Sequence, residues 1–259
     1  MSKFSLKNKV AVVTGGGSGI GEAISLTFAQ QGAKVHILDF NLEAAEHVVS
    51  QIKKLESSAE AHKCDVSNQK NVFEVINGIL KTENINILIN NAGIAHVGNI
   101  EAVEEADLDR LYNVNIKGVY NCLKAVIPSM KSHGGGVILN LASIASSVGL
   151  SDRFAYSMTK GAVLTMTYSV AKDYINDGIR CNSIAPGRVH TPFVDGFISK
   201  NYPGREAEMF EKLSKTQPIG RMGSTQEMAD LVLFLCSDEA GFITGSNYAI
   251  DGGFVTLNG

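Results

Sequence analysis

Tyr156 and Lys160 stand four residues apart in a stretch of helical character, which places both side chains on one face of a helix. A phenol is a poor base at neutral pH, and lowering its pKa from ~10 to ~7 requires about 4 kcal/mol of preferential phenolate stabilisation. A neighbouring ammonium can supply much of this where water is scarce. Ser143, thirteen residues before the tyrosine, can hold a substrate oxygen. The pattern indicates proton exchange with an alcohol or ketone, although the tyrosine and lysine alone also fit a solvated helix pair.

A glycine-rich segment, TGGGSGIG at residues 14–21, follows the apolar run 10–13 and precedes a helical pattern. Glycine lets phosphate oxygens approach backbone N–H groups, and the start of the next helix attracts the anion. The segment therefore predicts a bound nucleotide, the alternative being a plain strand-to-helix turn. Its spacing is G-x-x-x-G-x-G, so the more common G-x-G-x-x-G fingerprint is not met as written.

Asp39 closes the second predicted strand, eighteen residues after Gly21. A carboxylate there can accept both hydroxyls of an adenosine ribose and would repel a 2′-phosphate. Ser18 precedes Gly19, and no arginine or lysine stands beside either the turn or the strand end. The sequence therefore favours NAD over NADP, the alternative for Asp39 being a solvated residue at a strand end.

The elements that must position these residues follow a regular alternation of valine- and isoleucine-rich runs with helical patterns. Such alternation predicts a Rossmann-like, doubly wound parallel sheet of about seven strands with helices on both faces, in one domain spanning residues 1–259. The predicted strands are 9–14, 34–39, 59–64, 86–91, 136–142, 179–185 and 248–251. The predicted helices are 19–31, 42–56, 68–81, 104–131, 154–176 and 225–237.

Residues 188–223 interrupt this rhythm with three prolines and several glycines around a short helical stretch at 205–215. A long irregular insertion after a strand end is typical of an active-site lid, and we expect it to form a loop over the substrate.

Bulk composition excludes several classes of protein. A net charge of −3 and a pI near 6.1 give no electrostatic footprint for nucleic acid or for an anionic membrane. No stretch approaches the ~18 apolar residues of a membrane span. The four cysteines are far apart and form no C-x-x-C pair, so neither a metal site nor a disulfide framework is expected. We expect a soluble cytoplasmic protein with buried, reduced thiols.

Taken in order, these motifs resemble the short-chain dehydrogenase/reductase family along essentially the whole chain. Residues 14–21 fit its T-G-x-x-x-G-x-G turn, which accounts for the unusual glycine spacing, and Asn90-Asn91-Ala92-Gly93 match its N-N-A-G segment. Ser143, Tyr156 and Lys160 match its catalytic group.

The resemblance implies that Tyr156 is the general acid/base and that Ser143 positions the substrate oxygen. It further implies that Lys160 tunes the tyrosine and holds the nicotinamide ribose, and that Asn115 serves a water-mediated proton relay. Hydride would move between the nicotinamide and a secondary carbinol carbon, with no metal required.

The resemblance also implies the remaining cofactor contacts, with Asp65 and Val66 beside adenine and Ile20 at the pyrophosphate. Residues 186–191 would surround the nicotinamide carboxamide. A homotetramer is implied as well, with the helices at 104–131 and 154–176 packed between subunits. The cofactor-binding residues expected in this way are Gly15, Ser18, Gly19, Ile20, Gly21, Asp39, Phe40, Asp65, Val66, Asn91, Ala92, Gly93, Tyr156, Lys160, Pro186, Gly187, Val189 and Thr191.

Arg153 lies three residues before Tyr156, where a guanidinium could bind a substrate carboxylate, or else form a surface salt bridge. Arg188 and His190 are further candidates for the substrate pocket. Residues 144–192 look like the branch of the family with type 2 3-hydroxybutyrate dehydrogenase and 2-keto-3-deoxy-L-fuconate dehydrogenase, which implies a small hydroxy acid or sugar acid as substrate.

Three alternatives remain. The first is a 3-oxoacyl-carrier-protein reductase, which normally uses NADPH and has a basic residue in the cofactor turn. The second is a neutral sugar or polyol dehydrogenase. The third is a non-enzymatic nucleotide-binding protein, which the full catalytic group disfavours.

Overall fold

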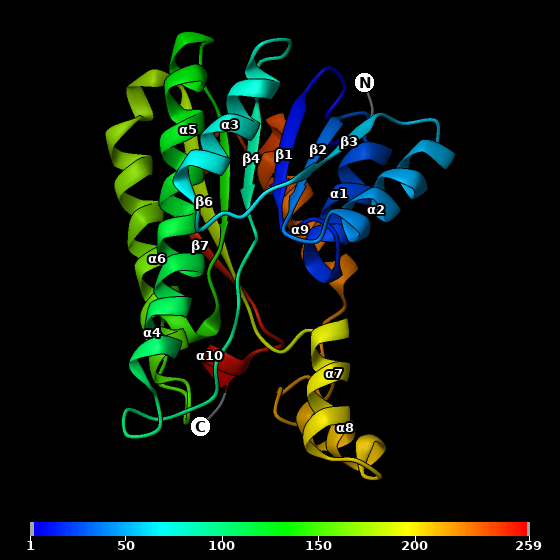
Figure 1. Ribbon diagram of the computed structural model, residues 1–259, viewed down its shortest axis with the longest axis vertical. Helices are drawn as coiled ribbons and strands as arrows, with labels where there is room; N and C mark the ends of the chain where they lie inside the picture. The colour runs from blue at the N-terminus through cyan, green and yellow to red at the C-terminus, as the bar shows by residue number, and fades with distance from the viewer. Residues whose placement is uncertain (1–2, 258–259) are drawn as a thin grey trace.

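Seven parallel strands form the centre of the molecule, in the order β3-β2-β1-β4-β5-β6-β7 (Figure 1). The order reverses between β1 and β4, which creates the switch point where open α/β sheets bind ligands. The predicted Rossmann-like fold is therefore confirmed in this computed structural model, which describes residues 3–257. The strands are β1 (Val10–Thr14), β2 (Lys34–Asp39), β3 (Ala59–Lys63), β4 (Ile87–Asn90), β5 (Gly136–Leu141), β6 (Ile179–Pro186) and β7 (Asn247–Ile250).

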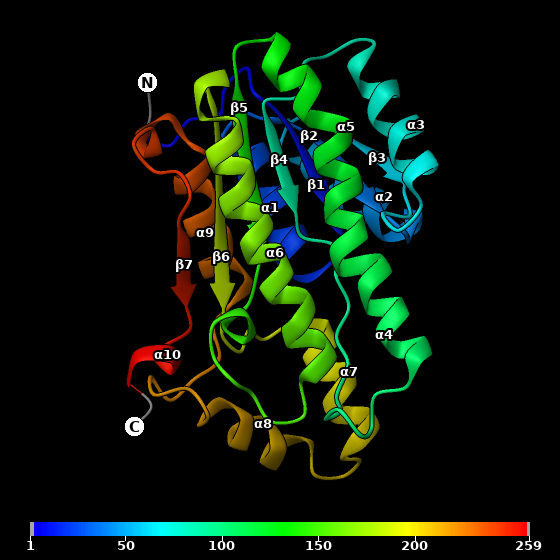
Figure 2. The same ribbon diagram turned by 90° about the vertical axis from the view of Figure 1, so that its left-hand side faces the viewer.

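Helices cover both faces of the sheet (Figures 1 and 2). Along β1, Ala11 and Val13 belong to one apolar cluster and Val12 to the other, and all three are fully buried. Strands buried on both faces read as continuous apolar runs, which is why the sequence revealed them. One layer consists of α1 (Gly19–Gln30), α2 (Leu42–Lys54) and α9 (Thr225–Cys236), and the other of α3 (Gln69–Leu80), α5 (Gly118–Ser132) and α6 (Phe154–Asp173).

The prediction of one helix over 104–131 was wrong in its detail. The segment consists of α4 (Glu105–Leu111), a π-helical stretch (Tyr112–Lys117) and α5. The wider turn contains Asn115, whose side chain bonds to both backbone groups of Ile94 in a neighbouring loop. Insertions of this kind are frequent at functional sites.

The prediction that residues 188–223 form an irregular loop with one short helix was also incomplete. The segment contains two helices, α7 (Pro192–Asn201) and α8 (Glu206–Ser214). Pro192 was read as an interruption, but it occupies the first turn of α7, where its missing N–H leaves no intrahelical bond unmade. Near the end of the chain, Asp251 accepts bonds from the N–H groups of Gly253 and Val255 and caps the short helix α10 (Phe254–Leu257).

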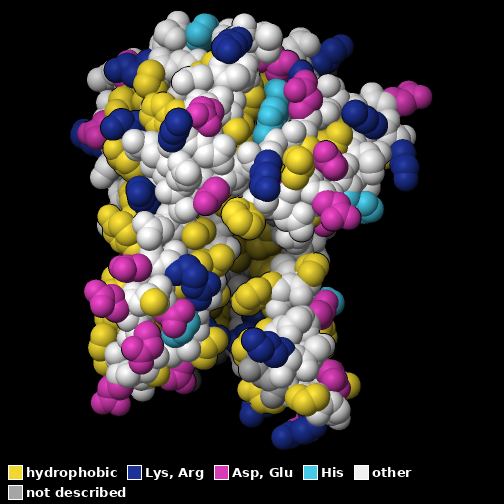
Figure 3. All heavy atoms as spheres, viewed as in Figure 1, with side chains coloured by type: hydrophobic (Ala, Val, Ile, Leu, Met, Phe, Trp, Pro, Cys, Tyr) yellow, Lys and Arg dark blue, Asp and Glu magenta, His cyan; other side chains and the backbone are white. Residues whose placement is uncertain are grey.

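A deep hollow opens between two projections of the molecule, one ending in α4 and the other formed by α7 and α8 (Figure 3). The carboxyl ends of the strands point towards it (Figure 2). The fold thus presents its loop-rich edge to this hollow. Among residues 3–257, no helix combines the length and the apolar character that a membrane crossing requires.

Alanine at two glycine positions should change the free energy of unfolding in opposite directions. Gly78 lies in the exposed interior of α3, where an added Cβ would meet no atom within 4 Å. We expect Gly78→Ala to stabilise the protein by about 0.5–1 kcal/mol, because alanine restricts the unfolded chain and favours the helix. Gly135 has φ +114°, and a Cβ there would lie 2.2 Å from the Gly178 carbonyl oxygen. Urea unfolding of both alanine variants should therefore show opposite shifts, and a destabilised Gly78→Ala would contradict the open environment of α3.

Candidate functional site

The glycine turn leaves no room for side chains where β1 meets α1. Gly15 and Gly19 have φ of +62° and +59°, and a Cβ on Gly21 would lie only 2.1 Å from the Gly15 carbonyl oxygen. A Cβ on Gly19 would lie 3.6 Å from the Thr191 side chain, which places the starts of α1 and α7 close together. Ser18 and Ile20 flank this point at the first turn of α1. The arrangement fits a pyrophosphate held by backbone N–H groups.

Asp39 is fixed at the end of β2 by two backbone donors. Its Oδ2 accepts a bond from the N–H of Gly17 at 2.9 Å, and its Oδ1 accepts one from Asn41 at the same distance. A Cβ on Gly17 would lie 2.9 Å from that Oδ2, so glycine permits the close approach. The Phe40 side chain next to Asp39 is 72% exposed. Its aromatic face is open to stacking by a flat ring such as the expected adenine. The carboxylate is therefore held in one place next to the glycine turn.

The loop after β3 forms another part of this edge. Asp65 Oδ1 accepts bonds from the backbone N–H and the hydroxyl of Ser67, at 3.0 and 2.7 Å. Val66 is buried, and its carbonyl oxygen accepts a bond from Asn121 of α5 at 2.8 Å. The side chains expected near adenine are thus held by local bonds and by packing against α5.

Asn91 ties the loop after β4 to the glycine turn across the switch point. Its Nδ2 donates to the carbonyl oxygens of Thr14 and Gly15 at 3.0 and 2.9 Å. The Thr14 hydroxyl oxygen in turn accepts bonds from the N–H groups of Asn91 and Ala92. Thr14 was not named as a site residue by the sequence analysis, although it is the first residue of the glycine motif.

The four residues of the expected catalytic group converge on this loop. A Cβ on Gly93 would lie 3.3 Å from Asn115 Oδ1 and 3.6 Å from Lys160 Nζ. Lys160 Nζ lies 5.8 Å from the centre of the Tyr156 ring, and the Ser143 side chain is near enough to lower the pKa of the tyrosine. Ser143 stands two residues beyond β5 rather than within it.

Asn115 is held in a fully bonded, buried position. Its Nδ2 donates to the carbonyl oxygen of Ile94 at 2.9 Å and to the hydroxyl of Thr159 at 3.0 Å. Its Oδ1 accepts the N–H of Ile94 at 2.8 Å. The side chain therefore positions the loop after β4 against α6. Thr159, next to Lys160, was missed because a helical threonine carries no sequence signal for this contact.

Burial dominates the electrostatics of the catalytic group. It raises the pKa of Tyr156, whereas the Ser143 hydroxyl and the positive charge of Arg153 lower it. Burial also lowers the pKa of Lys160 to about 8, and the ammonium bonds to the Leu141 carbonyl oxygen at 2.6 Å. The sequence analysis expected Lys160 to lower the tyrosine pKa. In the structure the charge of Arg153 lowers that pKa, and Lys160 bonds to a backbone carbonyl oxygen. The effect expected of Lys160 on the tyrosine stays a prediction.

Arg153 and Arg188 face the same region although they are far apart in the chain. Burial lowers the pKa of Arg188, and the charge of Arg153 lowers it further. Arg153 begins α6 beside a bridge to Gly98, whose N–H donates to the Asp152 carbonyl oxygen at 2.9 Å. In the part of the chain that the structure describes, neither arginine has a carboxylate within ion-pairing distance. The surface salt bridge considered for Arg153 is thus not found there.

The insertion is closed at its base. Val189 is buried and forms a bridge with Gly223, and the N–H of His190 donates to the carbonyl oxygen of Gly223 at 2.8 Å. His190 Nε2 bonds to Asp195 of α7 at 2.8 Å, and its ring packs edge-on against Phe210 of α8. The structure therefore gives His190 partners within the two lid helices.

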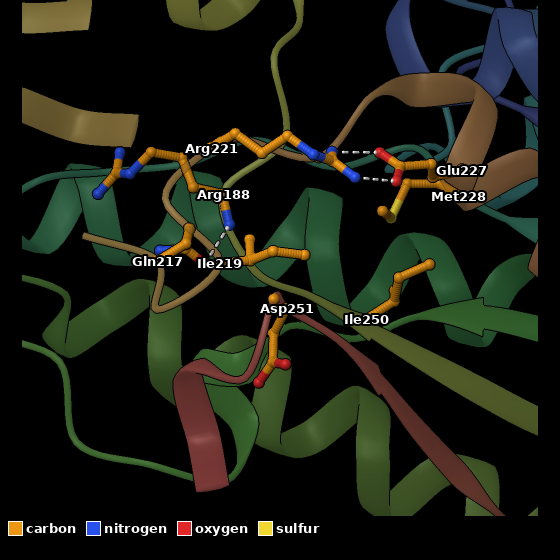
Figure 4. A pocket seen from close by; sticks show the side chains of 10 residues that line it. Arg188, Gln217, Ile219, Arg221, Glu227, Met228, Ile250 and Asp251 are labelled. Atoms are coloured by element: carbon orange, nitrogen blue, oxygen red, sulfur yellow. Dashed lines mark hydrogen bonds and ion pairs between the residues drawn. The ribbon is translucent and has the colours of Figure 1, made fainter. Parts of the chain in front are cut away.

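A small cavity lies behind the turn that follows β6 (Figure 4). A Cβ on Gly187 would lie 2.6 Å from Gln217 Oε1, so Pro186 and Gly187 pack closely against the far end of the insertion. Arg188 extends along this wall, with its Nε bonded to the Thr216 hydroxyl at 3.3 Å. The turn expected at the carboxamide is therefore held on its outer side by the insertion.

Known proteins match nearly the whole chain. A family model described as "Enoyl-(Acyl carrier protein) reductase" matches residues 15–255. Cyclohexanol dehydrogenase of Acinetobacter sp. (strain SE19) is 38% identical over 259 residues, covering 98% of this chain and 97% of the relative. The 3-oxoacyl-(acyl-carrier-protein) reductase FabG of Thermotoga maritima is 36% identical over 251 residues, covering 96% of this chain and 99% of the relative. The crystal structure of L-sorbose reductase from Gluconobacter frateurii, complexed with NADPH and L-sorbose, matches with a TM-score of 0.94 at 27% identity, covering 99% and 100%.

Burial of the Lys160 ammonium should lower the free energy of unfolding of the protein. Its pKa falls from 10.5 to about 8, which corresponds to about 3 kcal/mol, offset by about 1 kcal/mol from the bond to Leu141. We expect Lys160→Met to stabilise the cofactor-free protein by about 2 kcal/mol at pH 7. The difference should shrink as pH rises from about 8 to 10.5, because wild-type lysine becomes neutral in the folded state first and then in the unfolded state. Urea unfolding at pH 7 and pH 10 measures both effects, and a less stable variant at pH 7 would refute this account.

Proposed function

The chain belongs to the short-chain dehydrogenase/reductase family, and we propose that it is an NAD-dependent dehydrogenase of a small hydroxy acid or sugar acid. As a member of this family it is an oxidoreductase that interconverts alcohols and ketones with a nicotinamide dinucleotide. The observation that carries the finer proposal is the pair Arg153 and Arg188. The charge of Arg153 acts on Tyr156 and on Arg188, and neither arginine has a carboxylate partner among the described residues.

The residues present fit the dinucleotide. A Cβ at Gly21 would fill the turn that the pyrophosphate approaches, and the bonded carboxylate of Asp39 stands where a ribose can donate to it. When bound, the cofactor accepts or returns a hydride. The protein supplies the proton chemistry: Tyr156 takes the hydroxyl proton of the alcohol, while Ser143 holds its oxygen. The charge of Arg153 favours the phenolate form that this step requires.

The proposal of NAD over NADP rests on Asp39. Both of its carboxylate oxygens are already bonded to backbone N–H groups, so the negative charge cannot turn away from an incoming 2′-phosphate. L-sorbose reductase was crystallised with NADPH and 7α-hydroxysteroid dehydrogenase with NADH, so this fold accepts either dinucleotide and local residues make the choice.

A carboxylate-bearing substrate follows from the same two arginines. Two guanidiniums near enough to lower one pKa repel each other, and an anion between them would relieve that repulsion. This supports the resemblance to the branch with type 2 3-hydroxybutyrate dehydrogenase and 2-keto-3-deoxy-L-fuconate dehydrogenase. We do not extend the assignment to His190, which is bonded to Asp195 in the lid.

Two other substrates have support from the relatives. A 3-oxoacyl-carrier-protein reductase is favoured by the match to FabG, and a neutral sugar or alcohol by the likeness to L-sorbose reductase and cyclohexanol dehydrogenase. Asp39 disfavours the usual NADPH of the first, and a neutral substrate would leave Arg153 and Arg188 unpaired. A purely nucleotide-binding role is disfavoured because the expected catalytic side chains converge.

We further propose a cytoplasmic homotetramer with one catalytic domain per chain. All four cysteines are buried free thiols, which fits a reducing compartment. In the outer layer of helices, α5 and α6 lie side by side (Figure 2), and several large side chains of this layer are exposed. Such a face is typical of a subunit interface. These side chains are Tyr112, Tyr120, Phe154, Met158 and Tyr168.

The proposed function predicts a specific loss of activity. A screen of NAD and NADP reduction over hydroxy acids, sugar acids, neutral sugars and polyols should give the best rates with NAD and an acid. Tyr156→Phe should then lower kcat by about 10²–10⁴-fold, the usual contribution of a positioned acid/base. Tyr174→Phe, directly after the end of the same helix, is the matched control. Near-wild-type turnover in Tyr156→Phe, or a preference for NADP, would reject the corresponding assignment.

The two arginines can be tested by substrate charge. Arg153→Gln and Arg188→Gln should each raise KM for the best acid by about 10–100-fold, the equivalent of one charged hydrogen bond, but should change little for its primary amide. Arg153→Gln should also move the pH profile of kcat to higher pH, because its charge lowers the tyrosine pKa. Arg205→Gln, exposed at the start of α8, is the control. Equal KM changes for acid and amide would remove the carboxylate from the assignment.

A further inference from the structure

A group of metal-ligating side chains lies outside the dinucleotide site, on the edge strands β2 and β3. His36 pairs with Glu60 across the two strands, and His62 stands two residues further along β3, so all three point to the same face of the sheet. One donor atom from each residue can be chosen such that all lie within 4.8 Å of one another. The sequence analysis expected no metal site, because the cysteines are far apart and the implied hydride transfer requires no metal, and it did not consider these histidines.

His36 is already oriented as a ligand. Its side chain is buried, and its Nε2 lies 2.9 Å from Glu83 Oε2 in the loop between α3 and β4. A carboxylate at this nitrogen fixes the proton on Nε2 and leaves the lone pair of Nδ1 free. Metal-binding histidines commonly donate their second ring N–H to a carboxylate in this way.

The free nitrogen faces a second imidazole. His36 Nδ1 lies 2.9 Å from His62 Nε2, so His62 donates its proton to His36 in the metal-free protein. Two imidazoles that bind one tetrahedral zinc ion at 2.0–2.1 Å have nitrogens about 3.3 Å apart. The pair would therefore open by a few tenths of an ångström, with a turn of the His62 ring. His62 is only partly buried on the edge strand, which leaves room for this movement.

We propose that His36 Nδ1, His62 Nε2 and the Glu60 carboxylate bind a divalent transition-metal ion of the zinc type, with water in the fourth position. The proton that His62 now donates would move to its other ring nitrogen through solvent, so both lone pairs reach the metal. Imidazole and carboxylate ligands in this number suit zinc or cobalt.

Lys34 competes for this site. Its ammonium bonds to Glu60 at 2.7 Å and also to Glu83, and these two carboxylates raise its pKa. Binding of the metal requires the ammonium to leave Glu60, while Glu83 retains it. The ammonium of Lys34 therefore occupies part of the site, and its removal should strengthen metal binding.

The site would lie apart from the expected dinucleotide site. It joins β2 to the edge strand β3 and, through Glu83, to the loop before β4. Asp39 lies three residues along β2, or about 10 Å away, so the metal would not touch the expected cofactor. Pinning an edge strand limits its fraying and its pairing with other chains. The inference does not depend on the proposed substrate or activity.

Metal titration of chelator-treated full-length protein tests the proposal, with Co²⁺ as a spectroscopic probe and Zn²⁺ as the physiological candidate. We expect one Co²⁺ per chain with the intense visible absorption of a tetrahedral site, and a Zn²⁺-dependent rise in Tm. His62→Gln should weaken Co²⁺ binding at least about tenfold and abolish the rise in Tm. His47→Gln, on the exposed face of α2, should leave both unchanged.

Two outcomes would overturn the proposal. The first is the absence of one-to-one binding, and the second is an unchanged affinity in His62→Gln. Because His36 is buried, its substitution would disturb the fold as well as the site, so the partly buried His62 carries the test. Lys34→Met should tighten binding several-fold by freeing Glu60, and unchanged or weaker binding would reject Glu60 as the third ligand.

Discussion

The hydrogen bonds that join Asn91 to the glycine turn are the constraint on which the site depends. They connect the ends of β1 and β4, where the strand order reverses and where the sheet can no longer supply paired backbone groups. The Asn91 amide takes up the carbonyl oxygens of Thr14 and Gly15, so the N–H groups at the start of α1 remain directed to the ligand. Asp39 lies on one side of these hydrogen bonds. Gly93 lies on the other side, next to the expected catalytic side chains.

Burial of the catalytic group has opposite effects on its two titratable members. It raises the pKa of Tyr156 and lowers the pKa of Lys160, because burial destabilises the charged form of each side chain. The spacing of the two residues in the sequence therefore does not set their protonation by itself. The protein offsets this with the Ser143 hydroxyl and with the charge of Arg153. Proteins commonly accept such local instability at reactive sites, because the same low dielectric strengthens each interaction with the substrate.

The insertion after β6 has a double role in this arrangement. Its base is closed by the bridge between Val189 and Gly223, while α7 and α8 project beyond the sheet and form one side of the hollow (Figure 3). His190 bonds to α7 and packs against α8, so it joins the two lid helices to the end of the sheet. Arg188 lies at the root of the same segment. The segment that we expect to cover the substrate therefore also contains one of the two charges that we propose to recognise it.

Reading the residues alone was enough to predict the sheet, the order of its elements, the glycine turn, Asp39 and the pairing of Tyr156 with Lys160. These features follow from short-range rules: strands buried on both faces are continuously apolar, and residues four apart share a helical face. Folding was needed to reveal the π-helical turn at Asn115, the helix α7, the effect of Arg153 on Arg188 and the contact of His36 with His62. Each of these depends on contacts between segments distant in the chain, where packing sets the distances and burial sets the charges, and no local pattern records either.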